Sequence, residues 1–207
     1  MKTSSKRRFI FWVLFFMFIT AIAFYFDSRV AISMQYVRNS FLTSFFLNFG
    51  SSSTVAVLVI LLTALFFQQK KRDKILPLWF AAALSVVVSF ILKIVVQRPR
   101  PFQIGLIPIL GTPDPSYSIW DFSFPSFHTV AVFAMLPFLD KEFPKFRYVW
   151  IALAVIIGFS RMYLGVHFLS DVLAGGVIGY IIGRTIVETE EETGFWARLY
   201  NRIFKRN

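Results

Sequence analysis

Long apolar runs separated by short charged segments dominate the sequence. Six of these runs are almost free of charge, and they cover residues 9–26, 51–69, 75–92, 122–139, 148–160 and 166–183. An apolar stretch of about 18 residues is long enough for a helix to cross the hydrocarbon core of a bilayer. The pattern therefore predicts an all-α integral membrane bundle of six transmembrane helices, with a short one at 148–160.

Weaker patterns predict what lies around these helices. Residues 30–48 are amphipathic, and we expect an additional helix there that lies at the membrane interface. No internal repeat is visible, so residues 1–207 are expected to form a single domain, in which 188–207 is a cytoplasmic tail. Gly175, Gly179 and Gly183 recur every four residues, which predicts a face for close packing against another helix. We expect the first run to be a retained signal anchor, because it is longer than the apolar region of a typical cleaved signal peptide.

The composition agrees with a membrane protein. Hydrophobic residues make up 57% of the chain and charged residues 16%, against about a quarter charged in soluble domains. The chain has no cysteine, which excludes disulfides and thiolate chemistry. The net charge of +11 could indicate nucleic-acid binding. The basic residues flank the apolar runs instead, as topology signals do, so we expect a lipid bilayer and no nucleic acid as partner.

The basic residues also predict the orientation of the chain. With six crossings, sixteen of the 22 Lys and Arg residues fall on the side of the N-terminus. Positive charge concentrates on the cytoplasmic side, so we expect both termini there and the protein in the cytoplasmic membrane. The other six basic residues fall on the outer face: Arg29, Arg38, Lys93, Arg98, Arg100 and Arg161. We interpret Arg98 as a surface charge, with a secondary phosphate contact as the alternative.

Both histidines of the chain fall at this outer level. His167 and Asp171 are four residues apart on a predicted helix and should share one face. Contact with a carboxylate fixes the tautomer of an imidazole and raises its basicity, although such a pair can also be a simple hydrogen bond within a bundle. Ser126 and His128 begin another apolar run at the same level. Ionisable residues within membrane segments are functional by default.

This cluster could hold either a metal ion or an oxyanion. A metal ion could use His128, His167 and Asp171 as ligands. The fixed cations nearby are Lys93, Arg100 and Arg161. They would repel a metal ion, but they would bind phosphate by charge-assisted hydrogen bonds. Ser126 and the amides at the start of its helix add donors. We therefore expect an oxyanion site with no metal and no cofactor.

Three spaced segments resemble the signature of the type 2 phosphatidic acid phosphatase superfamily. They are KIVVQRPRP at 93–101, PSFH at 125–128 and SRMYLGVHFLSD at 160–171. The superfamily includes membrane lipid phosphatases, glucose-6-phosphatase and the vanadium haloperoxidases. The chain departs from the pattern at Phe127, where the family usually has Gly. If the site needed a positive φ there, Phe127 would be strained.

The resemblance implies a mechanism and a class of substrate. His167, oriented by Asp171, would attack phosphorus and form a phosphohistidine. His128 would protonate the leaving oxygen and then activate water. The phosphate-binding residues would be Lys93, Arg100, Ser126, Phe127 through its backbone, and Arg161. The substrate would be a membrane lipid phosphate at the outer face, such as undecaprenyl diphosphate, phosphatidylglycerophosphate, phosphatidic acid or lipid A.

Three other functions share part of this pattern. A non-catalytic lipid or anion binder or transporter would need the cations but not the histidines. A vanadate-dependent haloperoxidase would share the anion site. Those enzymes look like larger soluble proteins, so the six predicted membrane spans argue against this alternative. A sugar phosphatase like glucose-6-phosphatase would act on a water-soluble substrate. The preferred lipid and the oligomeric state are left open by the sequence.

Overall fold

Helices account for most of the structure, a computed structural model that describes residues 2–49, 53–110 and 122–204. Within these ranges the chain forms eight α-helices, and no strand is found there. The helices are α1 (Lys2–Met34), α2 (Ser40–Phe49), α3 (Thr54–Gln68), α4 (Ile75–Val96), α5 (Phe127–Glu142), α6 (Arg147–Tyr163), α7 (Leu169–Thr193) and α8 (Phe195–Phe204). Three short 3₁₀ turns join some of them: η1 (Gln35–Val37), η2 (Arg72–Lys74) and η3 (Pro144–Phe146). The all-α prediction is confirmed.

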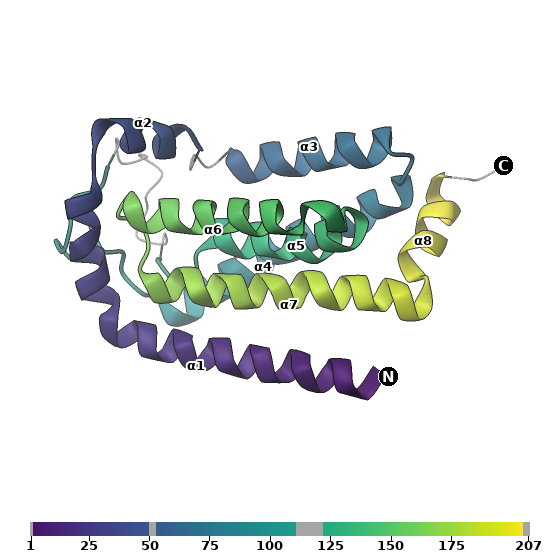
Figure 1. Cartoon of the computed structure of the whole chain (residues 1–207), viewed down its shortest axis with the longest axis horizontal. Helices are drawn as coiled ribbons and strands as arrows, with labels where there is room; N and C mark the ends of the chain where they lie inside the picture. Colours follow the sequence, from purple (N-terminus) through teal and green to yellow (C-terminus); the bar gives the residue numbers. More distant parts are fainter. Residues whose placement is uncertain (1, 50–52, 111–121, 205–207) are drawn as a thin grey trace.

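Four stretches are long and apolar enough to cross a membrane. They cover Arg7–Val37, Arg72–Val96, Pro144–Tyr163 and Leu169–Thr193, which contain most of α1 and all of α4, α6 and α7. The remaining two predicted spans correspond to α3, with 15 residues, and α5, with 16. Both are shorter than the ~20 residues that a transmembrane helix usually needs, although they run alongside the longer helices (Figure 1). The count of six crossings therefore stays a prediction.

One end of the bundle collects the helix ends that carry the predicted site. There α4 and α6 end and α5 and α7 begin, and we call this the site end (Figure 1). At the opposite end, α1 begins and α8 lies beside the last turn of α7. Helix α5 lies at the centre, and all its residues from His128 to Leu139 are buried except Phe133. The first turn of α5 is therefore enclosed by other helices.

Glycines on α7 allow α5 and α7 to touch through their backbones. A Cβ atom at Gly179 would lie 2.1 Å from the carbonyl oxygen of Val130, and one at Gly183 would lie 2.1 Å from that of Ala134. At Gly175 the corresponding atom is the Ser126 carbonyl oxygen, at 2.9 Å. Any side chain at these positions would force the helices apart. The predicted close-packing face is confirmed, and it fixes the start of α5 against α7.

The single amphipathic helix expected at 30–48 does not form. Instead α1 continues to Met34, and after η1 the backbone is extended at Arg38, with φ −71° and ψ 130°. The break coincides with contacts to the end of α6. Arg38 donates from Nε to the carbonyl oxygen of Tyr163 at 3.1 Å, and the Asn39 N–H donates to the Tyr163 hydroxyl at 2.9 Å. The Asn39 side chain then accepts the N–H of Leu42 and caps α2.

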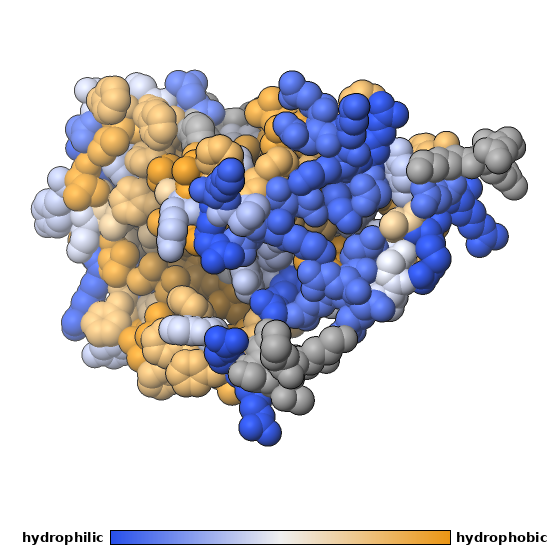
Figure 2. Space-filling view, turned by 45° about the vertical axis from the view of Figure 1, so that its right-hand side comes forward, coloured by the Kyte–Doolittle hydropathy of each residue, from blue (hydrophilic) through white to orange (hydrophobic). Residues whose placement is uncertain are grey.

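Hydrophilic residues gather at the end opposite the site end. Figure 2 shows them around α8, whereas hydrophobic residues cover much of the flank. The segment 188–207, expected to be a tail, begins inside α7 and continues as α8 as far as Phe204. Trp196 of α8 is buried, and its ring lies 4.9 Å from that of Phe80 on α4. Helix α8 is therefore packed on the bundle through Trp196, and the place of this segment relative to lipid headgroups stays a prediction.

Candidate active site

The residues predicted for the site all lie at the site end. Lys93 is in the last turn of α4, and its ammonium donates to the carbonyl oxygen of Phe122. Arg161 is buried in the last turn of α6. Arg100 follows α4, is 4% exposed, and donates to the carbonyl oxygen of Val166 at 3.1 Å. Two neighbouring cations, Lys93 and Arg100, and the distant Arg161 are thus held at one end of the bundle.

The first turn of α5 contributes the PSFH segment. Ser126 is the N-cap residue of α5, and its N–H donates to the carbonyl oxygen of Asp171 at 3.1 Å. Its buried hydroxyl accepts a hydrogen bond from Thr129 at 3.0 Å. His128 follows in the first turn and is 8% exposed. The contact with Asp171 places the start of α5 directly beside the start of α7.

Phe127 is helical and unstrained. It is the first residue of α5, and among the described residues positive φ values outside glycine occur at Lys70 and Gln97. Its partly buried ring packs against the main hydrophobic cluster and lies edge-on to His128, with centroids 5.7 Å apart. The replacement of Gly at this position therefore needs no special backbone conformation.

His167 and Asp171 are close, but they do not share a helix as expected. α7 begins at Leu169, so His167 precedes it, and the His167 N–H is bound to the carbonyl oxygen of Arg161. The Asp171 carboxylate reaches back instead and accepts the N–H of Phe168 at 2.8 Å. Nδ1 of His167 lies 3.6 Å from Oδ2 of Asp171, beyond hydrogen-bond length. This buried nitrogen has no hydrogen-bond partner in the described part of the chain.

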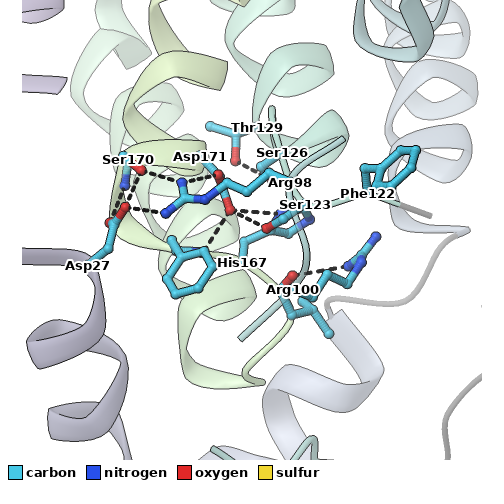
Figure 3. A network of polar contacts seen from close by, with 12 residues as sticks. Asp27, Arg98, Arg100, Phe122, Ser123, Ser126, Thr129, His167, Ser170 and Asp171 are labelled. Carbon is cyan, nitrogen blue, oxygen red and sulfur yellow. Dashed lines mark hydrogen bonds and ion pairs between the residues drawn. The ribbon is translucent and has the colours of Figure 1, made fainter. Parts of the chain in front are cut away.

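Asp171 is held by Arg98 (Figure 3), and the interpretation of Arg98 as a surface charge is wrong. Nη1 of Arg98 donates to Oδ1 of Asp171 at 2.7 Å, and Nη2 donates to Oδ2 of Asp27 at 2.6 Å. The guanidinium also lies over the rings of Phe24 and Phe168. A buried charge must be paired, and here one cation bridges two carboxylates, one on α1 and one on α7.

Asp27, Ser123 and Ser170 complete this network, and the sequence analysis missed all three. Ser123 donates its hydroxyl to Oδ2 of Asp171. Asp27 accepts the N–H of Ser170 at 2.9 Å and also its hydroxyl. One signal was present for Asp27: it is the only acidic residue before Asp73 and directly follows an apolar run. A single carboxylate at a membrane segment is expected to pair with a cation, because an unpaired charge there is costly.

The surroundings of His167 favour its neutral form. Burial lowers the pKa of His167 well below its ordinary value of 6.5, and the following residues add to this effect in decreasing order: Arg100, Lys93, Arg161 and His128. A neutral imidazole has a lone pair available for attack. The structure therefore combines a buried imidazole, whose pKa is lowered, with three fixed cations.

This arrangement suits an oxyanion better than a metal ion. Across the described ranges, no group of three His, Asp or Glu side chains is placed to hold a metal ion. The cations near His167 are Arg100, Lys93 and Arg161, and side chains of this kind bind phosphate oxygens by charge-assisted hydrogen bonds. The structure thus brings three cations close to a buried imidazole.

A comparison with models of protein families shows which family this chain belongs to. Residues 74–193 match the PAP2 superfamily. This chain belongs to the PAP2 superfamily. The resemblance seen in the three sequence segments is confirmed, and all eight predicted site residues fall within the PAP2 region.

Known PAP2 proteins agree in sequence and in fold. A lipid A 1-phosphatase of Rhizobium johnstonii is 32% identical over 105 residues, or 49% of this chain and 42% of the relative. An undecaprenyl-diphosphatase of Sulfolobus acidocaldarius is 32% identical over 108 residues, which are 52% of this chain and 50% of the relative. The crystal structure of a transmembrane PAP2-type phosphatidylglycerolphosphate phosphatase from Bacillus subtilis superposes with a TM-score of 0.68 at 25% identity, covering 87% of this chain and 94% of that one. The match thus spans about half the length or less of the two curated relatives.

Proposed function

We propose that this protein is an integral membrane lipid phosphatase that works through a phosphohistidine at His167 and needs no metal ion. One observation carries the proposal: a buried imidazole with a lowered pKa lies among Arg100, Lys93, Arg161 and His128. Such cations stabilise the charge on a phosphoryl group during transfer. The PAP2 relatives are named as phosphatases, and the proposal extends this activity to the present chain.

The first step transfers the phosphoryl group to the enzyme. Nε2 of neutral His167 attacks phosphorus, and the bond from phosphorus to the lipid oxygen breaks. The imidazole becomes positively charged, and Asp171, facing Nδ1 at 3.6 Å, stabilises that charge. Catalytic hydrogen bonds are often long without substrate and shorten in the complex. His128 gives its proton to the leaving oxygen, so that the lipid leaves as an alcohol or a monophosphate.

The second step returns the enzyme to its starting form. His128, now neutral, takes a proton from water, and the resulting hydroxide attacks phosphorus. The bond from phosphorus to Nε2 breaks, inorganic phosphate leaves, and His167 is neutral again. General acid–base assistance of this kind contributes roughly 10²–10⁴-fold to the rate.

The position of the site suggests a lipid substrate at the level of the headgroups. The ligating residues lie at helix ends, so a phosphate can be bound there while its hydrocarbon chain stays in the bilayer. Both ends of the described chain lie at the opposite end of the bundle (Figure 1), so that cytoplasmic termini would place the site on the outer face. The relatives act, by their names, on lipid A, undecaprenyl diphosphate and phosphatidylglycerolphosphate, and these lipids with phosphatidic acid are the candidate substrates.

Phosphate release in detergent with EDTA tests the proposal. The panel contains the four lipids and a sugar phosphate, and His167→Ala is assayed beside the parent protein. We expect release from at least one lipid that survives chelation and is lost in the variant. Release from the sugar phosphate alone would indicate a sugar phosphatase. If neither compound class is hydrolysed while inorganic phosphate still binds, the protein is an anion binder and the proposal is wrong.

A further inference from the structure

A long groove runs along the flank of the bundle, from the side of the site end toward the opposite end. It lies between α1, α6 and α7 with α5 as its floor, and its volume is about 1000 Å³. We call it the flank groove. On α6 it extends from Arg147 to Met162 and on α7 from Leu169 to Arg184. At 1.5 Å per residue this corresponds to roughly 22 Å, which exceeds the depth of one leaflet of a ~30 Å hydrocarbon core.

The walls of the flank groove are apolar over most of this length. Aromatic side chains of α1 form one wall, and aliphatic residues and glycines of α6 and α7 form the others; among them are Trp12, Phe16, Val155, Gly158, Leu173 and Gly176. Its volume lies at the upper end of the range for ligand pockets. A surface of this shape fits a flexible hydrocarbon chain.

Cations from three helices line the groove toward the end opposite the site end. They are Arg8 on α1, Arg147 at the start of α6, and Arg184 on α7. Arg147 is paired with Asp140, and Arg184 with Glu188. Arg8 has no carboxylate partner among the residues that the structure describes. The three arginines therefore carry one positive charge more than the two carboxylates balance.

We propose that the flank groove binds an anionic membrane phospholipid. Its acyl chain lies along the apolar walls, and its phosphate contacts the three arginines. Basic pockets between transmembrane helices on the cytoplasmic side are typical sites for anionic lipid headgroups. Arg8 and Arg147 lie near the starts of α1 and α6, whereas His167 lies at the site end, just before α7 begins. The bound lipid is therefore not the lipid that is hydrolysed. The site is independent of the proposed function.

Arg184 also links this lipid to the packing of α1. Its guanidinium lies over the ring of Phe9 on α1, 4.7 Å from the centroid, and the rings of Phe9 and Tyr180 are 6.4 Å apart. A phosphate between Arg8 and Arg184 would therefore join α1 to α7 at the same end as this contact. Loss of the lipid is expected to loosen the first half of α1.

Native mass spectrometry of the full-length protein tests the site. Phosphatidylglycerol is the probe and phosphatidylcholine the reference, since neither phosphodiester carries a terminal phosphate group that the proposed enzyme could release. We expect preferential binding of phosphatidylglycerol and roughly fivefold weaker binding in Arg8→Gln, the size expected for one arginine at a membrane surface. Arg7→Gln is the matched control, because it removes the same charge next to the groove without lining it, and it should bind as the parent does.

A second pair of variants tests the apolar part. Val155 lines the groove and is 54% exposed, so Val155→Trp should fill the groove without disturbing the core and should reduce retention of phosphatidylglycerol. Val87→Trp on α4, at 52% exposure, is the control outside the groove. Equal binding of the two lipids, or equal losses in Arg7→Gln and Arg8→Gln, would overturn the proposal. His167→Ala should keep the lipid; if it does not, the lipid binds at the catalytic site and the proposal is also wrong.

Discussion

Nη1 of Arg98 lies 2.7 Å from Oδ1 of Asp171. The bond leaves Oδ2 of Asp171 to face Ser123, the Phe168 N–H and Nδ1 of His167. Asp171 is therefore fixed in position before any substrate binds. From this pairing we propose that Arg98 is a positioning residue, which would act on phosphoryl transfer through Asp171 and His167 rather than by contact with the phosphate.

Replacing Arg98 by Lys is expected to slow the chemical step. Lys keeps the charge but loses the planar fork that holds two carboxylates at once. A displacement of about 1 Å in a catalytic group can cost roughly 10²-fold in rate, so we expect kcat to fall by about that factor. KM should change little, because the cations around His167 are untouched.

The conservative change Arg29→Lys is the control for Arg98→Lys. Arg29 is exposed and its guanidinium lies over Tyr25, so its exchange should leave both kinetic constants unchanged. A rise in KM with constant kcat in Arg98→Lys would indicate a direct phosphate contact and would contradict the positioning role.

Asp27→Asn is expected to destabilise the protein and to weaken the same network. Asn preserves the shape but removes the charge that balances half of the guanidinium, and hydrogen bonds to charged groups contribute about 1.5–3 kcal/mol. We expect a lower midpoint of thermal unfolding in detergent and a smaller loss of kcat than for Arg98→Lys. In the double variant the two losses should not add, because both residues act through one ion pair. Strict additivity would show that Asp27 acts separately.

His167 should make the stability of the fold depend on pH. Its pKa in the folded protein is lowered below 6.5 by burial and the neighbouring cations, whereas an unfolded His titrates near 6.5. Below that pH the unfolded chain binds a proton that the folded one does not, so the free energy of unfolding falls as the pH decreases. Thermal midpoints at a series of pH values should show this fall in the parent and a shallower one in His167→Gln. Identical slopes would argue against a neutral His167 in the folded state.

Gly179→Ala should disrupt the contact between α5 and α7. The added Cβ would lie 2.1 Å from the Val130 carbonyl oxygen, so the backbones must separate, and overpacking of this kind usually costs about 1–3 kcal/mol or more. Gly176→Ala is the matched control, since its Cβ would meet the Phe133 ring at 3.4 Å. Folded yield and thermal midpoint should fall for Gly179→Ala only. Similar losses in both variants would mean that helix propensity decides the outcome.

The features that the sequence predicted are those that depend on the order of residues within one segment. Apolar runs indicate helices wherever they occur, and the recurrence of Gly175, Gly179 and Gly183 fixes a helix face by spacing alone. The three motif segments fall at helix ends because the apolar runs stop there. Local patterns of this kind gave the all-α fold and the level at which His128 and His167 lie.

The features that the sequence did not predict depend on contacts between distant segments. Asp27 and Arg98 are 71 residues apart, and nothing in either neighbourhood shows that the two side chains meet. The break between α1 and α2 coincides with the contacts of Arg38 and Asn39 to Tyr163, more than a hundred residues away. The late start of α7 reflects a side chain that caps it, Asp171, and not the apolar pattern.

Trapping of a phosphoenzyme tests the central claim most directly. The purified protein is mixed with radiolabelled p-nitrophenyl phosphate, whose leaving group needs little protonation, and is quenched in alkali, which preserves phosphohistidine. His128→Ala should then accumulate label, because its second step is slow, and the label should map to His167. His167→Ala should carry none. Label on another residue, or turnover without His167, would contradict the account.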